Sequence, residues 1–370
     1  MGEAAVKRAR ASGCNARLAI NFFTQRNAPR HGKPSAVVHR SRAELEMGGA
    51  ITGVYIMARR RLVLVDGNAM VHSAWHGYPE RLGPDGLSYR ALHGFLSKIH
   101  RMDKAYQWDD MVVVFDPPGG SLYRKSLFSE YKAQRPEPDP DLVRQLFLIE
   151  SALFDLGIKT LRVHGVESDD VLGTLAKKAA REGSMVLVVT PDKDMAQLVD
   201  DNIAILRPLR GQAAMETPFD YVDATGVFNK YGVMPSQIAD WLALIGDSSD
   251  NIPGVNGVGP KKATALIEKY GDVRTLMTRA DEVPGKVGQA IKESRATMET
   301  IVKLTTIQTE LDDQEWEIRA ASWSEEGLSR WGSLASFPYW MGRFNFLLPE
   351  ESIAQEDMPH EDFPFDGPFE

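Results

Sequence analysis

The chain contains a single cysteine, Cys14, and this scarcity excludes two kinds of structure. One cysteine cannot form an intramolecular disulfide, and it cannot provide the several thiolates of a cysteine-rich zinc site. Long apolar runs are also missing, because the apolar stretch at residues 50–58 is far shorter than the ~20 residues that cross a bilayer. With 43% hydrophobic and 25% charged residues, the composition is that of a globular enzyme. We therefore expect an intracellular enzyme that has no membrane association and holds any metal through oxygen atoms.

Acidic residues outnumber basic ones outside the first 43 positions, whereas the opposite holds within them. Those positions hold nine of the 43 Lys and Arg residues and a single acid, Glu3, and they lack the pattern of a strand or helix. We predict that residues 1–58 are a transit peptide for a chloroplast or mitochondrion, with a disordered basic tail as the alternative. The rest of the chain is acidic, which is unusual for a protein that binds nucleic acid. Eight of its acids, however, lie in a tail at residues 350–370, and nine others follow a pattern of their own.

Acidic residues follow three short apolar runs that are typical of buried strands. Residues 62–65 lead into Asp66, residues 111–115 into Asp116, and residues 185–190 into Asp192 and Asp194. Parallel strands place such residues at one carboxyl edge of a sheet, where open α/β sheets bind ligands. Each of these acids alone could be turn chemistry or a helix cap. Their recurrence after successive strands instead favours one shared site.

Two more acidic segments complete the set, one at the start of a helical stretch and one after a later helix. The nine candidate metal ligands are Asp66, Asp116, Glu167, Asp169, Asp170, Asp192, Asp194, Asp247 and Asp250. So many carboxylates repel one another unless cations neutralise them. Oxygen ligands suit Mg²⁺ or Mn²⁺, and two such ions about 4 Å apart can hydrolyse a phosphodiester bond. The pattern therefore predicts a metal-dependent nuclease.

The segment after Asp116, residues 117–141, mixes cations with aromatic residues. Its candidate phosphate-binding cations are Arg124, Lys132 and Arg135, and its candidate base-stacking residues are Tyr123 and Tyr131. Cations hold phosphates and aromatic rings stack on unpaired bases, so this mixture suits a single strand that passes the metals. A solvated surface helix is the alternative interpretation.

A glycine-rich turn at residues 252–263 lies between two helical segments, residues 238–245 and 261–270. Its candidate DNA-binding residues are Gly254, Gly257, Gly259, Lys261 and Lys262. Such glycines leave backbone N–H groups open at a helix N-terminus, where phosphate binds without reading sequence. We interpret this segment as a helix-hairpin-helix, with an ordinary turn between two helices as the alternative.

The remaining pattern is that of an α/β protein that becomes helical after residue 235. Apolar residues at helical spacing predict helices over residues 88–106, 142–156 and 169–182, the last with Ser168 as its N-cap. A short strand is expected at residues 203–206, followed by a loop or hairpin at residues 207–218.

From about Arg61 to Pro349 the chain resembles the 5′-nuclease domain of bacterial DNA polymerase I, in the flap endonuclease and phage 5′-exonuclease superfamily. The resemblance lies in seven blocks that occur in the family's order: residues 64–67, 114–116, 130–136, 167–170, 190–194, 246–255 and the hairpin after them. It implies a PIN-like (resolvase-like), mostly parallel sheet flanked by helices, with a C-terminal helical helix-hairpin-helix subdomain. We expect the basic segment at 1–58, the catalytic domain at 59–220 with its arch at 117–141, the DNA-binding subdomain at 221–349 and a disordered acidic tail at 350–370.

The resemblance also implies roles for the candidate residues. Asp66, Asp116, Glu167, Asp169 and Asp170 would bind a first metal, directly or through water, and Asp192, Asp194, Asp247 and Asp250 would surround a second. Lys132, Arg124 and Arg135 would hold the scissile phosphate, and carbonyls near Val255 and Val258 resemble the family's potassium site. One departure is His72-Ser73, where bacterial relatives usually have a Tyr-Arg pair that contacts phosphate.

We therefore predict a two-metal 5′-3′ exonuclease and 5′-flap endonuclease that acts on DNA in replication or repair. We expect Mg²⁺ as cofactor with Mn²⁺ as a substitute, a monomer, and a protein partner for the acidic tail. Two alternatives are a related nuclease that acts on RNA or RNA–DNA hybrids and a structure-specific DNA-binding factor without turnover. A haloacid-dehalogenase-type phosphatase is disfavoured, because Asn68 stands where that fold needs an Asp.

Overall fold

The computed structural model describes residues 59–106, 108–209, 219–314, 316, 326 and 329–331. The predicted transit peptide, the acidic tail, residues 210–218 of the predicted loop and most of residues 315–349 lie outside the described residues. Within the described ranges, every helix is too short or too polar to traverse a lipid bilayer.

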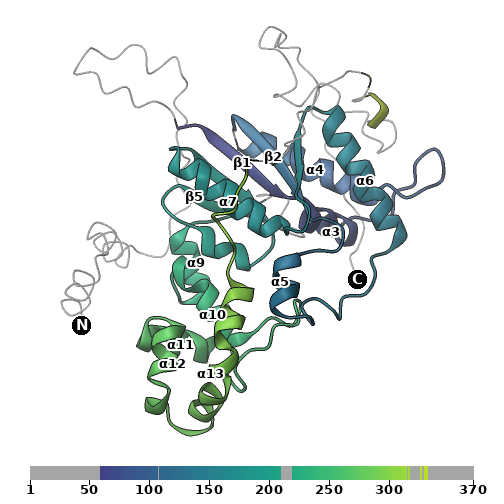
Figure 1. Cartoon of the computed structure of the whole chain (residues 1–370). Coiled ribbons are helices and arrows are strands. Elements are labelled where there is room, and N and C mark those ends of the chain that lie inside the picture. The colour runs from purple at the N-terminus through teal and green to yellow at the C-terminus, as the bar shows by residue number, and fades with distance from the viewer. Residues whose placement is uncertain are drawn as a thin grey trace, which may run out of the picture. The chain divides into compact units, whose positions relative to one another are not determined.

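A six-stranded sheet with the spatial order β3-β2-β1-β4-β5-β6 forms the centre of the N-terminal half (Figure 1). Neighbouring strands are parallel except for β5 and β6, which are antiparallel. The strands are β1 (Arg61–Asp66), β2 (Asp110–Phe115), β3 (Lys159–Arg162), β4 (Met185–Val189), β5 (Ile203–Pro208) and β6 (Phe219–Val222). The expectation of a mostly parallel sheet is confirmed.

Helices cover both faces of this sheet, because the side chains of the central strands alternate between two apolar clusters. Val63 and Val65 of β1 join a cluster with α3, α4 and α6, whereas Leu64 joins a cluster with α7 on the other face. The helices of this half are α3 (Gly67–Gly77), α4 (Arg90–Ala105), α5 (Leu122–Leu127), α6 (Pro140–Asp155), α7 (Ser168–Arg181) and the 3₁₀ helix η3 (Asp194–Leu198). Burial on both faces explains the continuous apolar runs of β1, β2 and β4.

The C-terminal half is helical and shares the cluster that contains Leu64. Its elements are α9 (Ala224–Tyr231), η4 (Pro235–Gln237), α10 (Ile238–Ile245), α11 (Pro260–Tyr270), α12 (Val273–Thr278), η5 (Ala280–Glu282) and α13 (Gly285–Thr305). The turn between α10 and α11 folds tightly onto the end of α10. A Cβ atom at Gly254 would lie 2.4 Å from the carbonyl carbon of Ile245, so that position requires glycine. Figure 1 shows the chain leaving α13 and running back beside α7.

The helices and strands that were predicted agree with the structure apart from their ends, whereas others, among them helices α3 and α9 and strands β3 and β6, were not predicted. Ser168 is the first residue of α7 rather than its N-cap, because Glu167 takes the extended cap position without a side-chain cap bond. Strands β3 and β6 were missed by the sequence pattern, since each has four residues and two of those are partly or fully exposed. The predicted strand at residues 203–206 extends to Pro208, which shortens the predicted loop.

Candidate metal and nucleic-acid site

The nine candidate metal ligands come from five segments of the chain that meet at the carboxyl edge of the parallel strands. Asp66 ends β1, and Asp116 follows β2. Glu167 precedes α7, Asp169 and Asp170 lie in its first turn, Asp192 and Asp194 follow β4, and Asp247 and Asp250 lie between α10 and α11. The acids influence one another electrostatically, as Asp66 does with Asp116 and Asp192. This convergence is what the prediction of one shared site requires.

Four of the nine have cationic partners, and we call them the paired carboxylates: Glu167, Asp170, Asp247 and Asp250. Arg124 of α5 makes the most extensive contact. Its Nη1 lies 2.5 Å from Asp170 Oδ2 and 3.1 Å from Glu167 Oε2, and its Nη2 lies 2.8 Å from Asp170 Oδ1. Burial opposes the charge on Arg124, but the bonds and charge of Asp170 raise its pKa above the usual range. This guanidinium is therefore a permanent cation inside the site.

Lys132 and Arg135 of the predicted arch neutralise the next two carboxylates. Lys132 Nζ lies 2.6 Å from Glu167 Oε1 and 3.7 Å from Asp250 Oδ2. Arg135 Nη2 donates to Asp250 Oδ1 at 2.7 Å. Burial would lower the pKa of Lys132, but Glu167 and Asp250 raise it above its ordinary value. The arch cations therefore form ion pairs with carboxylates that were predicted to bind metals.

Tyr131 lies in the same contact and is buried, with only 3% of its surface exposed. Its hydroxyl is 3.0 Å from both Glu167 Oε2 and Asp250 Oδ2. Burial raises its pKa strongly, and the charges of Glu167 and Asp250 add to that shift, so the hydroxyl keeps its proton and donates it. In this arrangement the ring is buried and cannot stack on a nucleic-acid base. Tyr123, in contrast, is 41% exposed on α5.

The fourth paired carboxylate is Asp247, whose Oδ2 lies 2.6 Å from Lys193 Nζ. Burial alone would raise the pKa of Asp247, but the hydrogen bonds from Lys193 and Ser249 lower it below the ordinary value. Lys193 stands between two predicted metal ligands in the sequence, and that position was the only signal by which it could have been found.

The other five carboxylates form no ion pair within the part of the chain that the structure describes, and we call them the unpaired carboxylates: Asp66, Asp116, Asp169, Asp192 and Asp194. Burial raises the pKa of Asp66 to about 7, and the charges of Asp116 and Asp192 add to the shift. Burial and Asp192 raise the pKa of Asp194 to about 8. Burial also raises the pKa of Asp169 well above the usual range, with further contributions from Asp192 and Asp66. These anions are destabilised first by burial and in addition by one another.

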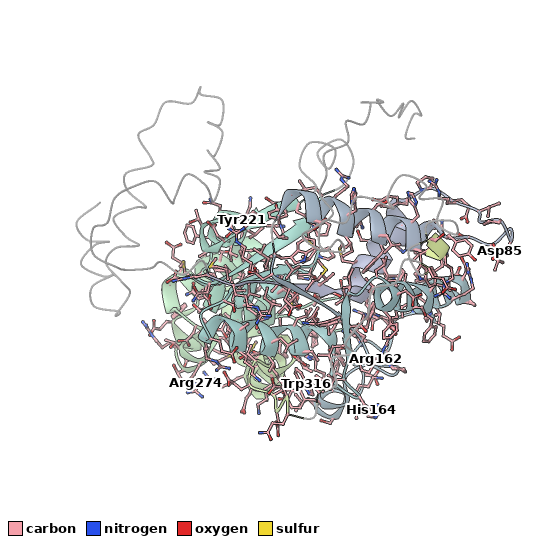
Figure 2. All side chains as sticks on the ribbon, turned by 90° about the horizontal axis from the view of Figure 1, so that it is seen from above. Asp85, Arg162, His164, Tyr221, Arg274 and Trp316 are labelled. Atoms are coloured by element: carbon pink, nitrogen blue, oxygen red, sulfur yellow. The ribbon has the colours of Figure 1, made fainter. Side chains whose placement is uncertain are left out.

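Neutral groups hold several of the unpaired carboxylates in place. Asp66 Oδ1 accepts from the N–H of Ala69 at 3.0 Å, and its Oδ2 accepts from Thr190 Oγ1 at 2.9 Å. Asp116 Oδ1 accepts from the N–H of Ser168 at 2.8 Å. Arg162, labelled in Figure 2 at the end of β3, donates to the backbone carbonyl of Asp116 rather than to its carboxylate. These hydrogen bonds orient the carboxylates but do not neutralise their negative charge.

The donor chemistry of the unpaired carboxylates fits a divalent cation. The Oδ1 atom of Asp194 is buried without a hydrogen-bond partner, which is a costly arrangement for a carboxylate. All the available donors are oxygens, the ligand type of Mg²⁺ and Mn²⁺. The described residues contain no group of three or more acidic, His or Cys side chains already placed as metal ligands. Side-chain rotations are therefore needed before an ion is fully coordinated.

The arch is fastened to the turn before the hairpin by backbone contacts. Lys132 N–H donates to the carbonyl of Asp250 at 3.0 Å, and Asn251 Nδ2 donates to the carbonyl of Glu130 at 2.7 Å. Gln134 Nε2 donates to the carbonyls of Ser248 and Ser249, at 2.9 and 3.1 Å. Lys132 and Asn251 both adopt positive φ angles, 56° and 59°, which are uncommon for residues other than glycine. The contacts across this junction maintain both conformations.

The predicted hairpin has the exposed surface that a phosphate backbone requires. Gly257, with φ of 75°, and Gly259 are exposed before α11, as are Lys261 and Lys262 in its first turn. Lys262 Nζ donates to the carbonyl of Gly257 at 2.7 Å, whereas no ion pair among the described residues involves Lys261. Both lysines thus lie exposed at a helix N-terminus, a position that binds anions.

His72 and Ser73, which depart from the family's Tyr-Arg pair, lie in different environments on α3. His72 keeps an exposed surface, but partial desolvation of its ring, together with the charges of His76 and Arg135, lowers its pKa. Ser73 is buried, and its Oγ accepts from Lys98 Nζ of α4 at 2.7 Å. Lys98 thus brings a cation next to the position where an Arg was expected. It was missed because α4 carries no part of the motif blocks.

Two family models match successive parts of the chain. Residues 61–232 match the 5′-3′ exonuclease, N-terminal resolvase-like domain, and residues 233–326 match the 5′-3′ exonuclease, C-terminal SAM fold. The fold expected from the resemblance is therefore confirmed.

Curated relatives agree with these matches. The chain is 36% identical over 219 residues to a 5′-3′ exonuclease of Aquifex aeolicus, which covers 59% of this chain and 72% of that protein. It is 41% identical over 215 residues to DNA polymerase I of Pseudomonas aeruginosa, covering 58% of this chain and 23% of the polymerase. The match thus spans about a quarter of the length of that polymerase.

Solved structures show the same fold. The bacteriophage T5 D15 protein co-crystallised with metal ions superimposes with a TM-score of 0.54 and 24% identity, over 68% of this chain and 90% of that one. The T5 D15 flap endonuclease in a complex with DNA and metal ions gives a TM-score of 0.55 and 21% identity, over 77% of this chain and 96% of that one.

Proposed function

Because this chain belongs to the 5′-3′ exonuclease family, we propose that it hydrolyses DNA phosphodiester bonds at 5′ ends and at the base of 5′ flaps. The observation that carries the proposal is the set of unpaired carboxylates beside the cationic arch. Such a set repels itself without divalent cations and binds phosphate poorly without them. Two T5 relatives were crystallised with metal ions, which supports the same requirement here.

Asp66, Asp116, Asp169, Asp192 and Asp194 would hold the ions, and we propose Mg²⁺ with Mn²⁺ as a substitute. When bound, such ions lower the pKa of water to give a nucleophile and stabilise the leaving oxygen. Asp247 and Asp250, which the sequence also assigns to the second metal, would contribute after release from their cations. The carbonyls near Val255 and Val258 remain a proposed K⁺ site.

The chain's own cations have a separate task, which is to bind the scissile phosphate. Lys132 and Arg135 lie at the edge of the carboxylate cluster, and both side chains remain partly exposed. Once the carboxylates turn toward metal, these two cations lose their partners and become available to a phosphate. The hairpin lysines, Lys261 and Lys262, would hold the duplex backbone away from the cut.

Several further proposals come from the sequence. They are a role in replication or repair within a chloroplast or mitochondrion, a monomeric state, a protein partner for the acidic tail, and the domain borders after residues 58, 220 and 349. An RNA or RNA–DNA hybrid substrate is the alternative in the same reaction class.

The decisive experiment is cleavage of a 5′-labelled double-flap DNA in Mg²⁺. We expect cutting at the flap base by the wild type, none by Asp116→Ala, and cutting slowed about 100-fold by Lys132→Ala. Arg60→Ala is the matched control, because it removes an exposed cation at the opposite end of β1. An all-RNA flap and an RNA–DNA hybrid, tested in parallel, decide the substrate class. A folded wild type that binds the flap but never cuts it in Mg²⁺ or Mn²⁺ would make this protein a binding factor instead.

A further inference from the structure

All five N–H groups of Arg124 are already used inside the protein. Three of the bonds go to Asp170 and Glu167. The other two go to backbone carbonyls, from Nε to Leu304 at 3.1 Å and from Nη2 to Thr306 at 3.1 Å. A guanidinium has five N–H donors and no more. Because the side chain is also only 4% exposed, a DNA phosphate finds neither a free donor nor a path to one.

The two carbonyls belong to the segment that leaves α13, residues 304–308, which we call the α13 strap. The strap also bonds directly to the site, because Gln308 N–H donates to Asp170 Oδ1 at 2.9 Å. Gln197 of η3 holds it from the other side, through the carbonyl of Thr305 at 3.1 Å and the N–H of Ile307 at 2.9 Å. The strap therefore lies between the helical C-terminal half and the first turn of α7.

The strap lies close against α7. A Cβ atom added at Gly173 would lie 2.6 Å from Ile307 Cγ2 and 3.2 Å from the carbonyl oxygen of Gln308. Only a hydrogen fits there, so a displacement of the strap by even one methyl group changes the bonds to Asp170 and Arg124. Gly173 lies one turn beyond Asp170 on α7 and takes no part in the carboxylate cluster itself.

Asp170 has little capacity left for a metal. Its two oxygens accept three bonds, from Arg124 Nη1, Arg124 Nη2 and Gln308 N–H. An ionised carboxylate has about four lone-pair positions. Glu167 shares Arg124 with Asp170, so its direction depends on the same guanidinium.

We propose that Arg124 is a positioning residue: with the α13 strap it fixes Glu167 and Asp170 and so sets the metal affinity of the site, and it does not bind the scissile phosphate. This inference rests on the proposed function. Because the strap continues from α13, the helical half that carries the hairpin is mechanically connected to the metal site. A change in α13 reaches Glu167 through one guanidinium.

The test compares Arg124→Lys and Gly173→Ala with the wild type. Arg124→Lys keeps the charge and loses the planar fork. Gly173→Ala pushes the strap away and raises helix propensity, so a loss of function does not come from a weaker helix. Arg181→Ala is the control, because it breaks only an exposed ion pair between α7 and Glu310, beyond the strap.

Three quantities are measured on each folded variant: flap binding without divalent ions, the Mg²⁺ concentration for half-maximal cleavage, and hydrogen exchange at the Gln308 amide. We expect the Mg²⁺ requirement to rise about 10-fold or more in Arg124→Lys and severalfold in Gly173→Ala, the range for disturbing groups that surround and orient metal ligands. Gln308 exchange should accelerate in both variants, and metal-free flap binding should stay within about twofold, since neither variant removes a phosphate contact.

Weaker metal-free flap binding by Arg124→Lys, with the Mg²⁺ requirement unchanged, would overturn the inference and make Arg124 a phosphate ligand. If Arg124→Lys fails to fold, an unchanged Mg²⁺ requirement in Gly173→Ala would overturn it equally. A wild type that never cleaves would instead refute the proposed function, and the Gln308 exchange would still report whether Arg124 holds the strap.

Discussion

The paired and unpaired carboxylates lie within one site yet have opposite electrostatic states. The paired set is neutralised by Arg124, Lys132, Arg135 and Lys193, and Asp247 accordingly has a lowered pKa. In the unpaired set, burial raises the pKa of Asp169, that of Asp66 to about 7 and that of Asp194 to about 8. Residues of the same type therefore serve different purposes. The paired carboxylates hold the arch, the strap and the hairpin turn against the sheet. The unpaired carboxylates are the groups that can bind a cation from solution.

The contrast also separates stability from activity. Removing a paired carboxylate leaves a cation without its partner, which destabilises the fold most where the cation is buried, as Arg124 is. Removing an unpaired carboxylate relieves repulsion, which stabilises the metal-free fold while it removes a ligand. The two sets should therefore respond to the same Asp→Asn substitution with opposite changes in stability.

The largest expected effect is on stability, at the buried pair between Asp170 and Arg124. Asp170→Asn should lower the free energy of unfolding by about 3–5 kcal/mol, because Arg124 stays buried with less negative charge around it. Denaturant unfolding in EDTA measures this change. Asp313→Asn, which breaks an exposed pair with Lys178, should leave the midpoint nearly unchanged. An equally small effect of Asp170→Asn would show that the pairing contributes nothing.

The next largest effect is expected at Asp194, where one substitution should lower activity and raise stability. Asp194→Asn should slow cleavage about 100-fold or more, equivalent to about 2.7 kcal/mol of activation free energy. The same substitution should raise the unfolding midpoint in EDTA at pH 8, because it removes a buried charge that Asp192 repels. A lower midpoint at that pH would contradict the assignment of Asp194 to the unpaired set.

The third expected effect is a dependence of stability on pH that Mg²⁺ reverses. Folding raises the pKa of Asp66 from 3.8 to about 7 and that of Asp194 to about 8. The folded state thus holds protons that the unfolded state has lost, so this contribution to stability is present below pH 4 and disappears as pH rises through 7 to 8. In EDTA the melting temperature should fall over that range. Mg²⁺ should restore it at pH 8.5 more than at pH 6, as calorimetry with and without Mg²⁺ can check.

Much of this site could be predicted because its acids follow strands with strong sequence patterns. Strands β1, β2 and β4 are buried on both faces and read as continuous apolar runs, so Asp66, Asp116 and Asp192 stand out at their ends. Strand β3, with four residues that include Lys159 and Arg162, has no such run, and it was missed.

The partners of the cations could not be predicted. In the sequence, Arg124 and Lys132 both look like phosphate ligands, because the sequence shows that they are charged but not whether their side chains are accessible to a phosphate. Whether a guanidinium is free depends on acceptors far along the chain, here the carbonyl of Thr306. The burial of Tyr131 has the same origin, because its hydroxyl bonds to Asp250, which lies 119 residues away. Only tertiary packing decides such cases.

The bond between Arg124 and Thr306 joins residues 182 positions apart, and Gln308 closes on Asp170 from 138 positions away. During synthesis on the ribosome, the sheet and its acids are therefore complete long before the strap exists. Contacts of such long range form late in folding. A growing or truncated chain that ends before Thr306 carries the carboxylates without the geometry that tunes them. We therefore expect the metal site to reach its final geometry only after the helical half has been synthesised and has folded.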